Sequence, residues 1–197
     1  MSAALPTLYL LRHGETENNV ERVITSQSDS ALTDKGRRQA SDNGKLLASL
    51  VPDLAAVDFI ASPLGRAADT MRLARQAAGL PPEPFRTDER LMEANFGDWT
   101  GLKIDEMFAQ RARDGSYAQD PWNFRMPNGE SRADVYARVA NFLADLKRDA
   151  VIVGHAGSVV MLRGIRLGMS REAVINLEAR NAGIVRLWGA CETAFGT

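Results

Sequence analysis

Residues 8–16, Leu-Tyr-Leu-Leu-Arg-His-Gly-Glu-Thr, decide the fold, because an unbroken apolar run ends abruptly in charged and polar residues. The first four residues are typical of a strand that is buried on both faces of a sheet. Further strands are expected at 57–60, 151–153 and 184–188, and a weaker one at 85–87. Most of these runs lack the alternation of a half-exposed strand, which favours a largely parallel sheet.

Helical periodicity fills the intervals between the predicted strands. Thr33 is the expected N-cap of a helix that runs to about Leu50, and further helices are expected at 64–78 and 131–147. Strands separated by helices predict an α/β fold, here a three-layer α/β/α sandwich with a mainly parallel sheet. Residues 95–130 contain aromatic residues, Gly and Pro but little periodicity, and we expect them to form a lid inserted over one edge of the sheet.

Composition excludes several classes of protein. The 197 residues are 45% hydrophobic and 25% charged, and they contain no repeat or linker, so one globular domain over 1–197 is expected. The net charge of −1 argues against a nucleic-acid partner, and a single cysteine, Cys191, excludes an internal disulfide and a structural zinc site built on thiolates. No apolar run reaches bilayer length and the first residues do not resemble a signal peptide. We therefore expect a soluble cytoplasmic protein without a membrane partner.

Charged and imidazole side chains follow three of the predicted strands. Arg12 and His13 follow the first strand, Arg66 follows the second, and His155 follows the run at 151–153. Because ligands of open α/β sheets bind beyond the carboxyl ends of the strands, these four side chains are expected to meet at one site. They include both histidines of the chain.

This set of side chains suits a phosphoryl group. Guanidinium groups offer forked donors that match phosphate oxygens, and a neutral imidazole can attack phosphorus to give a covalent phosphohistidine. The reaction also needs a group that protonates the leaving oxygen and later activates water. Glu93, within Leu-Met-Glu-Ala-Asn-Phe-Gly at 91–97, is the best candidate for that acid and base.

The motif at 11–16, followed by Asn19, resembles the signature of the histidine phosphatase superfamily, also called phosphoglycerate-mutase-like. The resemblance continues, in order, through the segments 32–40, 62–67, 96–99 and 153–157. Each segment is a weak signal alone, whereas the ordered set is specific and covers about residues 7 to 160.

The resemblance implies roles for individual residues. His13 would be the nucleophile that becomes phosphorylated, and Arg12 and Arg66 would bind the phosphoryl oxygens. His155 would stabilise the transferring group from the opposite side, and Ala156 directly after it is a further candidate substrate contact.

Two further roles complete the implied site. Asn19 would add a hydrogen bond at the rim of the phosphate pocket, and Glu93 would be the proton donor. The resemblance implies no metal and no cofactor. Glu15 and Thr16 are expected to organise the first helical turn instead of contacting substrate, since such residues commonly cap helices.

The sequence departs from the family pattern in two places. Many members carry a Gly-Arg-x-Gln-Gly run where this chain has Glu-Arg-Val-Ile-Thr-Ser-Gln at 21–27, so no phosphate contact is assigned to the 21–29 loop. True mutases resemble Glu-Arg-His-Tyr-Gly after the acidic residue, whereas this chain has Glu-Ala-Asn-Phe-Gly at 93–97. The missing Arg-His pair and the short chain favour a phosphatase over a mutase.

The sequence therefore predicts a metal-independent phosphomonoesterase that acts on a small phosphorylated metabolite, such as a sugar or nucleotide-loop precursor. A mutase, a non-catalytic phosphate-binding module and a metallohydrolase with two histidine ligands remain as alternatives. Substrate choice is expected to depend on the 95–130 segment, in which Trp99, Trp122 and Phe124 are expected to pack the lid. Its apolar residues are compatible with a homodimer without indicating one.

Overall fold

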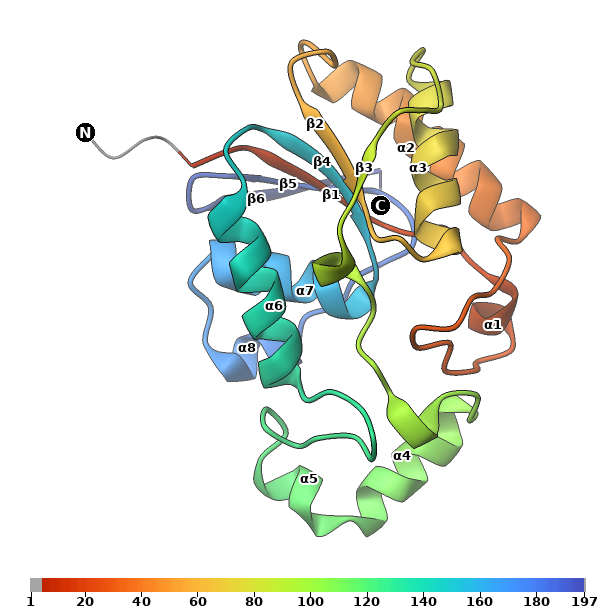
Figure 1. Ribbon diagram of the computed structural model, residues 1–197, viewed down its shortest axis with the longest axis vertical. Helices are drawn as coiled ribbons and strands as arrows, with labels where there is room; N and C mark the ends of the chain where they lie inside the picture. The colour runs from red at the N-terminus through yellow and green to blue at the C-terminus, as the bar shows by residue number, and fades with distance from the viewer. Residues whose placement is uncertain (1–4, 197) are drawn as a thin grey trace.

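A six-stranded sheet forms the centre of the computed structural model, which describes residues 5–196 (Figure 1). Its strands are β1 (Leu8–Arg12), β2 (Asp58–Ala61), β3 (Arg86–Thr87), β4 (Ala150–Gly154), β5 (Ile184–Trp188) and β6 (Cys191–Phe195). Their order across the sheet is β3-β2-β4-β1-β5-β6. The first four are parallel, β5 is antiparallel to β1, and β6 is antiparallel to β5. The predicted α/β class with a mainly parallel sheet is confirmed.

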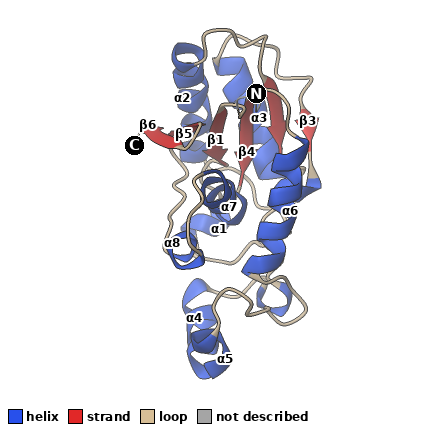
Figure 2. Cartoon of the chain, turned by 90° about the vertical axis from the view of Figure 1, so that its left-hand side faces the viewer, coloured by secondary structure: helices blue, strands red, loops and turns tan. Residues whose placement is uncertain are grey.

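Helices cover both faces of the sheet, in three layers (Figures 1 and 2). Side chains alternate along each strand, so that Leu10 and Ile152 face one core and Leu11 and Val151 face the other. The first core is closed by α6 (Arg132–Asp145) and α7 (Ala156–Arg166), with the short α8 (Arg171–Ile175) beside α7. The second core is closed by α2 (Asp34–Leu50) and α3 (Gly65–Ala77).

The predicted helices are present with small shifts at their ends. Thr33 caps α2 as expected, since its hydroxyl accepts the backbone N–H of Gly36 at 3.0 Å. The helix expected at 64–78 is one residue shorter at each end, and α6 follows its N-cap Ser131 and ends at Asp145, two residues before the predicted end.

Outside the segment 95–130, three elements are absent from the prediction: α7, α8 and β6. The first turn of α7, Ala-Gly-Ser at 156–158, has no apolar periodicity, and α8 is only five residues long. β6 is an edge strand with no buried residue, so it lacks the apolar signal that marks the other strands.

The segment 95–130 forms a protruding unit at one end of the molecule (Figures 1 and 2). It contains α4 (Ile104–Arg113) and α5 (Gly115–Gln119), preceded by 3-10 turns at Glu89–Leu91 and Gly97–Trp99. Trp99 and Phe124 stack within it at 5.7 Å between ring centroids, as expected. Trp122 differs from the expectation, because its ring packs edge-on against Tyr136 of α6 and belongs to the main core.

Within residues 5–196, no helix combines the length and the apolar character that crossing a bilayer requires. The expected single-domain span of 1–197 includes residues 1–4 and 197, which lie outside the described part of the chain.

Candidate active site

The pairing of β1 with β4 brings the two histidines together. The strands are parallel and in register, with Arg12 opposite Gly154, so the residue after each strand emerges at the same edge. The backbone N–H of His13 donates to the carbonyl of Gly154 at 2.9 Å, and the His13 and His155 ring centroids lie 5.1 Å apart. Both side chains are buried, at 3% and 0% exposure. The two strands thus deliver two imidazoles into one enclosed site.

The His13 ring is held in one tautomer and kept neutral. Its Nδ1 lies 2.8 Å from the carbonyl oxygen of Gly14. A carbonyl oxygen only accepts, so Nδ1 carries the proton and Nε2 keeps its lone pair. Burial lowers the pKa of His13 to about 3, and the charges of Arg12 and Arg66 act in the same direction. His13 therefore presents an unprotonated nitrogen at neutral pH.

His155 is oriented by a residue that follows β2. Its Nε2 lies 2.8 Å from the Ser62 hydroxyl, and the backbone N–H of Ser62 is fixed by the carbonyl of Val153 at 2.9 Å. Burial lowers the pKa of His155 well below its ordinary value, and the neighbouring His13 and arginine charges add to this. Within residues 5–196, its buried Nδ1 has no hydrogen-bond partner, so this nitrogen remains available to a bound group.

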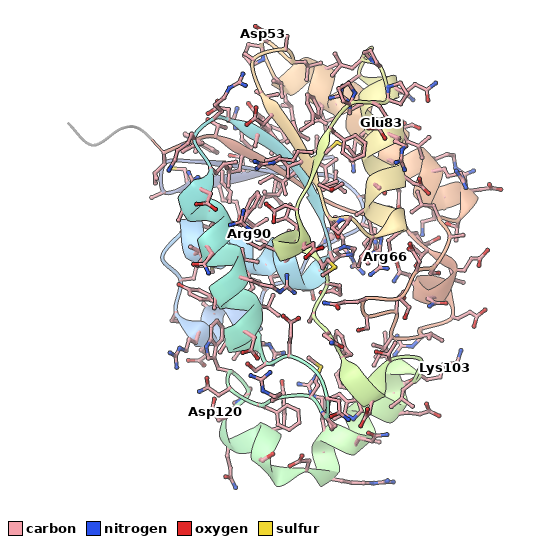
Figure 3. The ribbon with its side chains drawn as sticks, viewed as in Figure 1. Asp53, Arg66, Glu83, Arg90, Lys103 and Asp120 are labelled. Carbon is pink, nitrogen blue, oxygen red and sulfur yellow. The ribbon has the colours of Figure 1, made fainter. Side chains whose placement is uncertain are left out.

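Arg66 stands in the first turn of α3, where the helix meets the ends of the strands (Figure 3). Its guanidinium donates to the main-chain carbonyls of Ser26 at 2.7 Å and Ser28 at 2.6 Å, and it lies 3.6 Å from Asp29. Burial lowers the pKa of Arg66, and the negative charges of Glu93 and Asp29 oppose that change. The 21–29 loop, to which the sequence analysis assigns no phosphate contact, thus fixes the guanidinium group of Arg66.

Arg12 approaches from the end of β1. Its Nη1 donates to the carbonyl of Ala179 at 2.8 Å, while its buried Nε has no partner in the described part of the chain. Burial lowers the pKa of Arg12, and the charge of Glu93 opposes that change. Since guanidinium groups remain protonated in proteins, Arg12 and Arg66 place two positive charges beside the two neutral imidazoles.

Glu93 is fixed against the start of α7. Its Oε1 accepts the backbone N–H of Ala94 at 2.8 Å and that of Gly157 at 3.0 Å. A Cβ atom on residue 157 would lie 2.3 Å from this oxygen, so a larger residue there would displace the Glu93 carboxylate from its present position. The carboxylate that the sequence singles out is thereby placed against the first turn of α7, which begins directly after His155.

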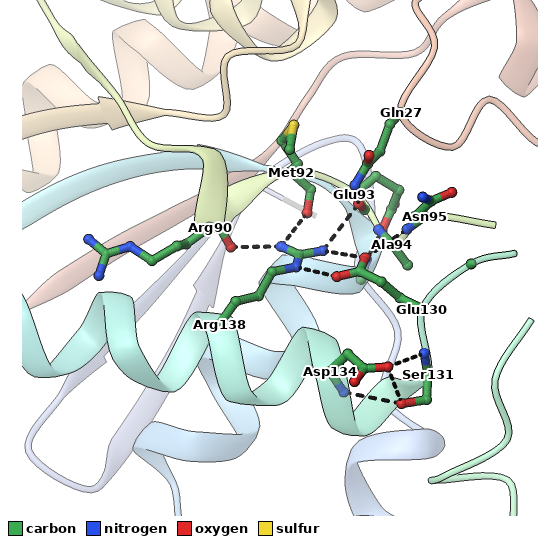
Figure 4. Close-up of polar contacts among 12 residues, drawn as sticks. Gln27, Arg90, Met92, Glu93, Ala94, Asn95, Glu130, Ser131, Asp134 and Arg138 are labelled. Atoms are coloured by element: carbon green, nitrogen blue, oxygen red, sulfur yellow. Dashed lines mark hydrogen bonds and ion pairs between the residues drawn. The ribbon is translucent and has the colours of Figure 1, made fainter. Parts of the chain in front are cut away.

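An arginine that the sequence analysis does not single out holds the chain around Glu93 (Figure 4). Arg138 of α6 donates to the carbonyls of Arg90 at 2.7 Å, Met92 at 2.8 Å and Glu93 at 3.1 Å. Its Nε forms an ion pair with Glu130 at 2.9 Å. The available signal was its position next to Val139 on the buried face of α6, where a charged residue needs partners.

Asn19 and Ala156, the two remaining candidates, have different surroundings. The Oδ1 of Asn19 accepts the backbone N–H of Thr16 at 3.2 Å, which completes a capping box for α1 (Glu17–Val20). The side-chain amide of Asn181 donates to the carbonyl of His13 at 2.8 Å, and its nitrogen also lies 3.5 Å from Oδ1 of Asn19. Thr16 caps α1, as predicted, while Ala156 is the first residue of α7.

A cavity of about 290 Å³ opens beside the site. It meets the site at Glu93, Ala156 and Gly157 and extends to the lid residues of α4 and α5, whereas the buried histidines do not line it. In the described part of the chain, no group of three or more His, Cys, Asp or Glu side chains is placed to hold a metal ion.

A family model described as the histidine phosphatase superfamily (branch 1) matches residues 8–190. The chain belongs to the histidine phosphatase superfamily. The resemblance carried by the sequence motifs is thereby confirmed.

Relatives within this superfamily carry two kinds of name. The "Probable phosphoglycerate mutase GpmB" of Erwinia tasmaniensis is 35% identical over 186 residues, which cover 91% of this chain and 83% of that protein. The mycobacterial glucosyl-3-phosphoglycerate phosphatase solved with VO3 is 30% identical, with a TM-score of 0.74 and coverage of 96% and 97%. The alpha-ribazole phosphatase of Shigella flexneri is 27% identical, with a TM-score of 0.75 and coverage of 96% and 95%. Membership alone therefore does not choose between mutase and phosphatase.

Proposed function

We propose that this member of the histidine phosphatase superfamily is a metal-independent phosphomonoesterase that acts on a small phosphorylated metabolite through a phosphohistidine at His13. One observation carries the proposal. Two neutral, buried imidazoles lie 5.1 Å apart, and Arg12 and Arg66 are close enough for their charges to lower the pKa of His13. Such a site offers a nucleophile and fixed positive charge to a phosphoryl group.

In the first step, Nε2 of His13 attacks phosphorus. The new N–P bond forms as the ester O–P bond breaks, and Glu93, in the protonated form that this step requires, gives its proton to the leaving oxygen. Arg12 and Arg66 bind the equatorial oxygens, and Nδ1 of His155 donates to one of them. The neutral ring of His13 is required because a protonated Nε2 has no lone pair.

In the second step, water replaces the alcohol. Glu93, now ionised, takes a proton from the water as its oxygen attacks phosphorus and the N–P bond breaks. Phosphate leaves, His13 returns to its neutral form, and Glu93 is again protonated. The position of Glu93 on the cavity wall, and its tether to Gly157, support this alternation of roles.

The residues that follow Glu93 favour hydrolysis over a mutase reaction. Ala94 is buried and has no charge, and the Asn95 side chain is occupied in accepting the backbone N–H of Gly97 at 2.9 Å. Neither residue offers a cation at the two positions where the mutase pattern has Arg and His. The phosphatase names of several structural relatives support the same choice.

The decisive experiment traps the intermediate. We expect that a labelled phosphomonoester mixed with the protein and quenched in base leaves label on His13, and that His13→Asn takes up none while remaining folded by circular dichroism. Label on a serine or a carboxylate would contradict the mechanism.

Two further readouts separate the alternatives. Product analysis distinguishes a phosphatase, which releases inorganic phosphate, from a mutase, which forms an isomeric phosphoester. Activity that persists in a strong chelator contradicts a metallohydrolase, and phosphate binding without hydrolysis across a broad panel of phosphoesters would indicate a binding module.

A further inference from the structure

Most of the walls of the cavity under the lid are apolar. Its walls include the rings and thioethers of Trp99, Met107, Phe124, Met126 and Met161. A sugar placed there would lose the hydration of its hydroxyls without gaining partners, which disfavours binding. An apolar or aromatic body gains by burial, and an apolar cavity of about 150 Å³ already admits benzene.

Two arginines stand in this otherwise apolar space, one from each side of the lid. The guanidinium carbon of Arg111 on α4 lies 3.5 Å from the ring centroid of Tyr117, and that of Arg132 on α6 lies 5.8 Å from it. Both arginines line the cavity together with Tyr117 and Glu93. Two positively charged groups therefore lie close to the same tyrosine ring.

In the part of the chain that the structure describes, neither charge is paired with a carboxylate. Within residues 5–196, no carboxylate forms an ion pair with Arg111 or Arg132, although Arg138 and Arg163, two other largely buried arginines, each have one. Arg111 has only the sulfur of Met107 at 3.6 Å, and its buried Nε has no partner there. Arg132 donates to the carbonyl of Pro121 at 2.8 Å and to the hydroxyl of Tyr117 at 3.4 Å, both uncharged.

Burial and mutual repulsion make this arrangement costly without an anion. Burial, together with the neighbouring charge of Arg132, lowers the pKa of Arg111 to about 10. Burial also lowers the pKa of Arg132. A bound anion removes both penalties, because it supplies opposite charge and acceptor atoms in a poorly solvated space.

From the unpaired Arg111 and Arg132 in an apolar cavity that begins at Glu93, we infer the class of substrate. It is a phosphomonoester with an apolar, ring-sized body and an anionic group at the end remote from the phosphate. This inference rests on the proposed function and narrows it, since it disfavours the sugar phosphates that the sequence alone suggested.

Binding of non-hydrolysable analogues tests the inference without turnover. The probes are benzylphosphonates with a para carboxymethyl group, its neutral amide, or a para phosphonomethyl group, each titrated by calorimetry. We expect wild-type protein to bind at least one anionic probe about 10-fold or more tightly than the amide, on the scale of a charge-assisted hydrogen bond. It should also bind unsubstituted benzylphosphonate more tightly than 2,3-dihydroxypropylphosphonate.

Arg111→Met should abolish the preference for the anionic probes, whereas Arg113→Met, which removes an exposed arginine from the same helix, should leave it unchanged. Arg111→Lys keeps the charge and should retain part of the preference. Equal binding of the anionic probes and the amide by wild-type protein, or equal effects of Arg111→Met and Arg113→Met, would overturn the inference.

A separate assay keeps the two proposals apart. Phosphate release from phenyl phosphate by wild-type protein tests the phosphatase reaction alone. Release without any anionic preference would refute only the substrate class, whereas an anionic preference without release would refute only the hydrolytic mechanism.

Discussion

Neutrality of the buried imidazoles follows from where β1 and β4 end. Neither ring is solvated, and each faces the positive charges of Arg12 and Arg66, so protonation is disfavoured on both counts. An unprotonated nucleophile at physiological pH thus requires no dedicated base. The only proton that must be moved in each step is the one on the substrate oxygen or water, which assigns a clear task to Glu93.

Glu93→Gln tests that task, because glutamine keeps the size and loses the proton. We expect turnover of an alkyl phosphate to fall about 10²-fold or more, while p-nitrophenyl phosphate, whose leaving group needs no protonation, is slowed far less. Steady-state rates with both substrates measure this difference. Glu89→Gln, an exposed change in the same connecting segment, is the control. Equal slowing of both substrates would contradict the role of Glu93 as acid.

At the level of single residues, the sequence was sufficient to predict that side chains at the ends of parallel strands converge. His13, His155, Arg12 and Arg66 follow strands or begin a helix next to one, so their convergence follows from parallel topology. The partners that fix them could not be predicted. Ser62, which lies 2.8 Å from His155, is 93 residues away from it in the chain, and nothing local marks that contact.

At the level of elements, Arg138 acts as a tie between α6 and the segment that carries Glu93. Because it satisfies three main-chain carbonyls and one carboxylate, it fixes a stretch of chain that has only a short 3-10 turn of its own. We regard it as a positioning residue, which acts on the reaction through Glu93.

Arg138→Met should lower turnover of an alkyl phosphate about 10-fold or more, since small displacements of an acid are costly. It should affect p-nitrophenyl phosphate less, because that substrate depends less on Glu93. Arg148→Met is the matched control, as Arg148 also bonds one carbonyl, of Ala56, and one carboxylate, of Asp58, both at the surface. An equal loss for both substrates would indicate a merely structural role.

Element boundaries were predictable where burial leaves a periodic trace. The strands at 8–12, 58–61 and 150–154 and the helices α2, α3 and α6 all bury a mainly apolar face or pair of faces. The lid has too small a core, around Ile24, Trp99 and Met107, to impose a period on its sequence. The position of the lid was predictable from the loss of periodicity. Its helices and the cavity beneath it were not predictable, because no period marks them.

For the whole molecule, the buried histidines couple stability to pH. The pKa of His13 is about 3 in the folded protein and about 6.5 when unfolded, so the unfolded state binds more protons between these values. The free energy of unfolding should therefore fall as pH is lowered from about 6.5 towards 3. We expect His13→Gln to make this fall shallower by about 1 kcal/mol per pH unit near pH 5.5.

Urea unfolding of both proteins between pH 4.5 and 7 measures the two slopes. Carboxylates contribute equally to each, so the difference between the slopes isolates His13. Parallel pH dependence would show that the His13 ring is protonated in the folded state.

The grip on Arg66 has an evolutionary consequence. Peptide oxygens of residues 26 and 28 hold this guanidinium, and every amino acid possesses such an oxygen. These two contacts therefore do not depend on which side chains stand at positions 26 and 28, provided that the main chain keeps its path, whereas Asp29 contributes through its own carboxylate. The 21–29 loop, whose sequence departs from the family pattern, can therefore still hold Arg66. A comparison of amino-acid sequences alone will underestimate how much of this contact is retained.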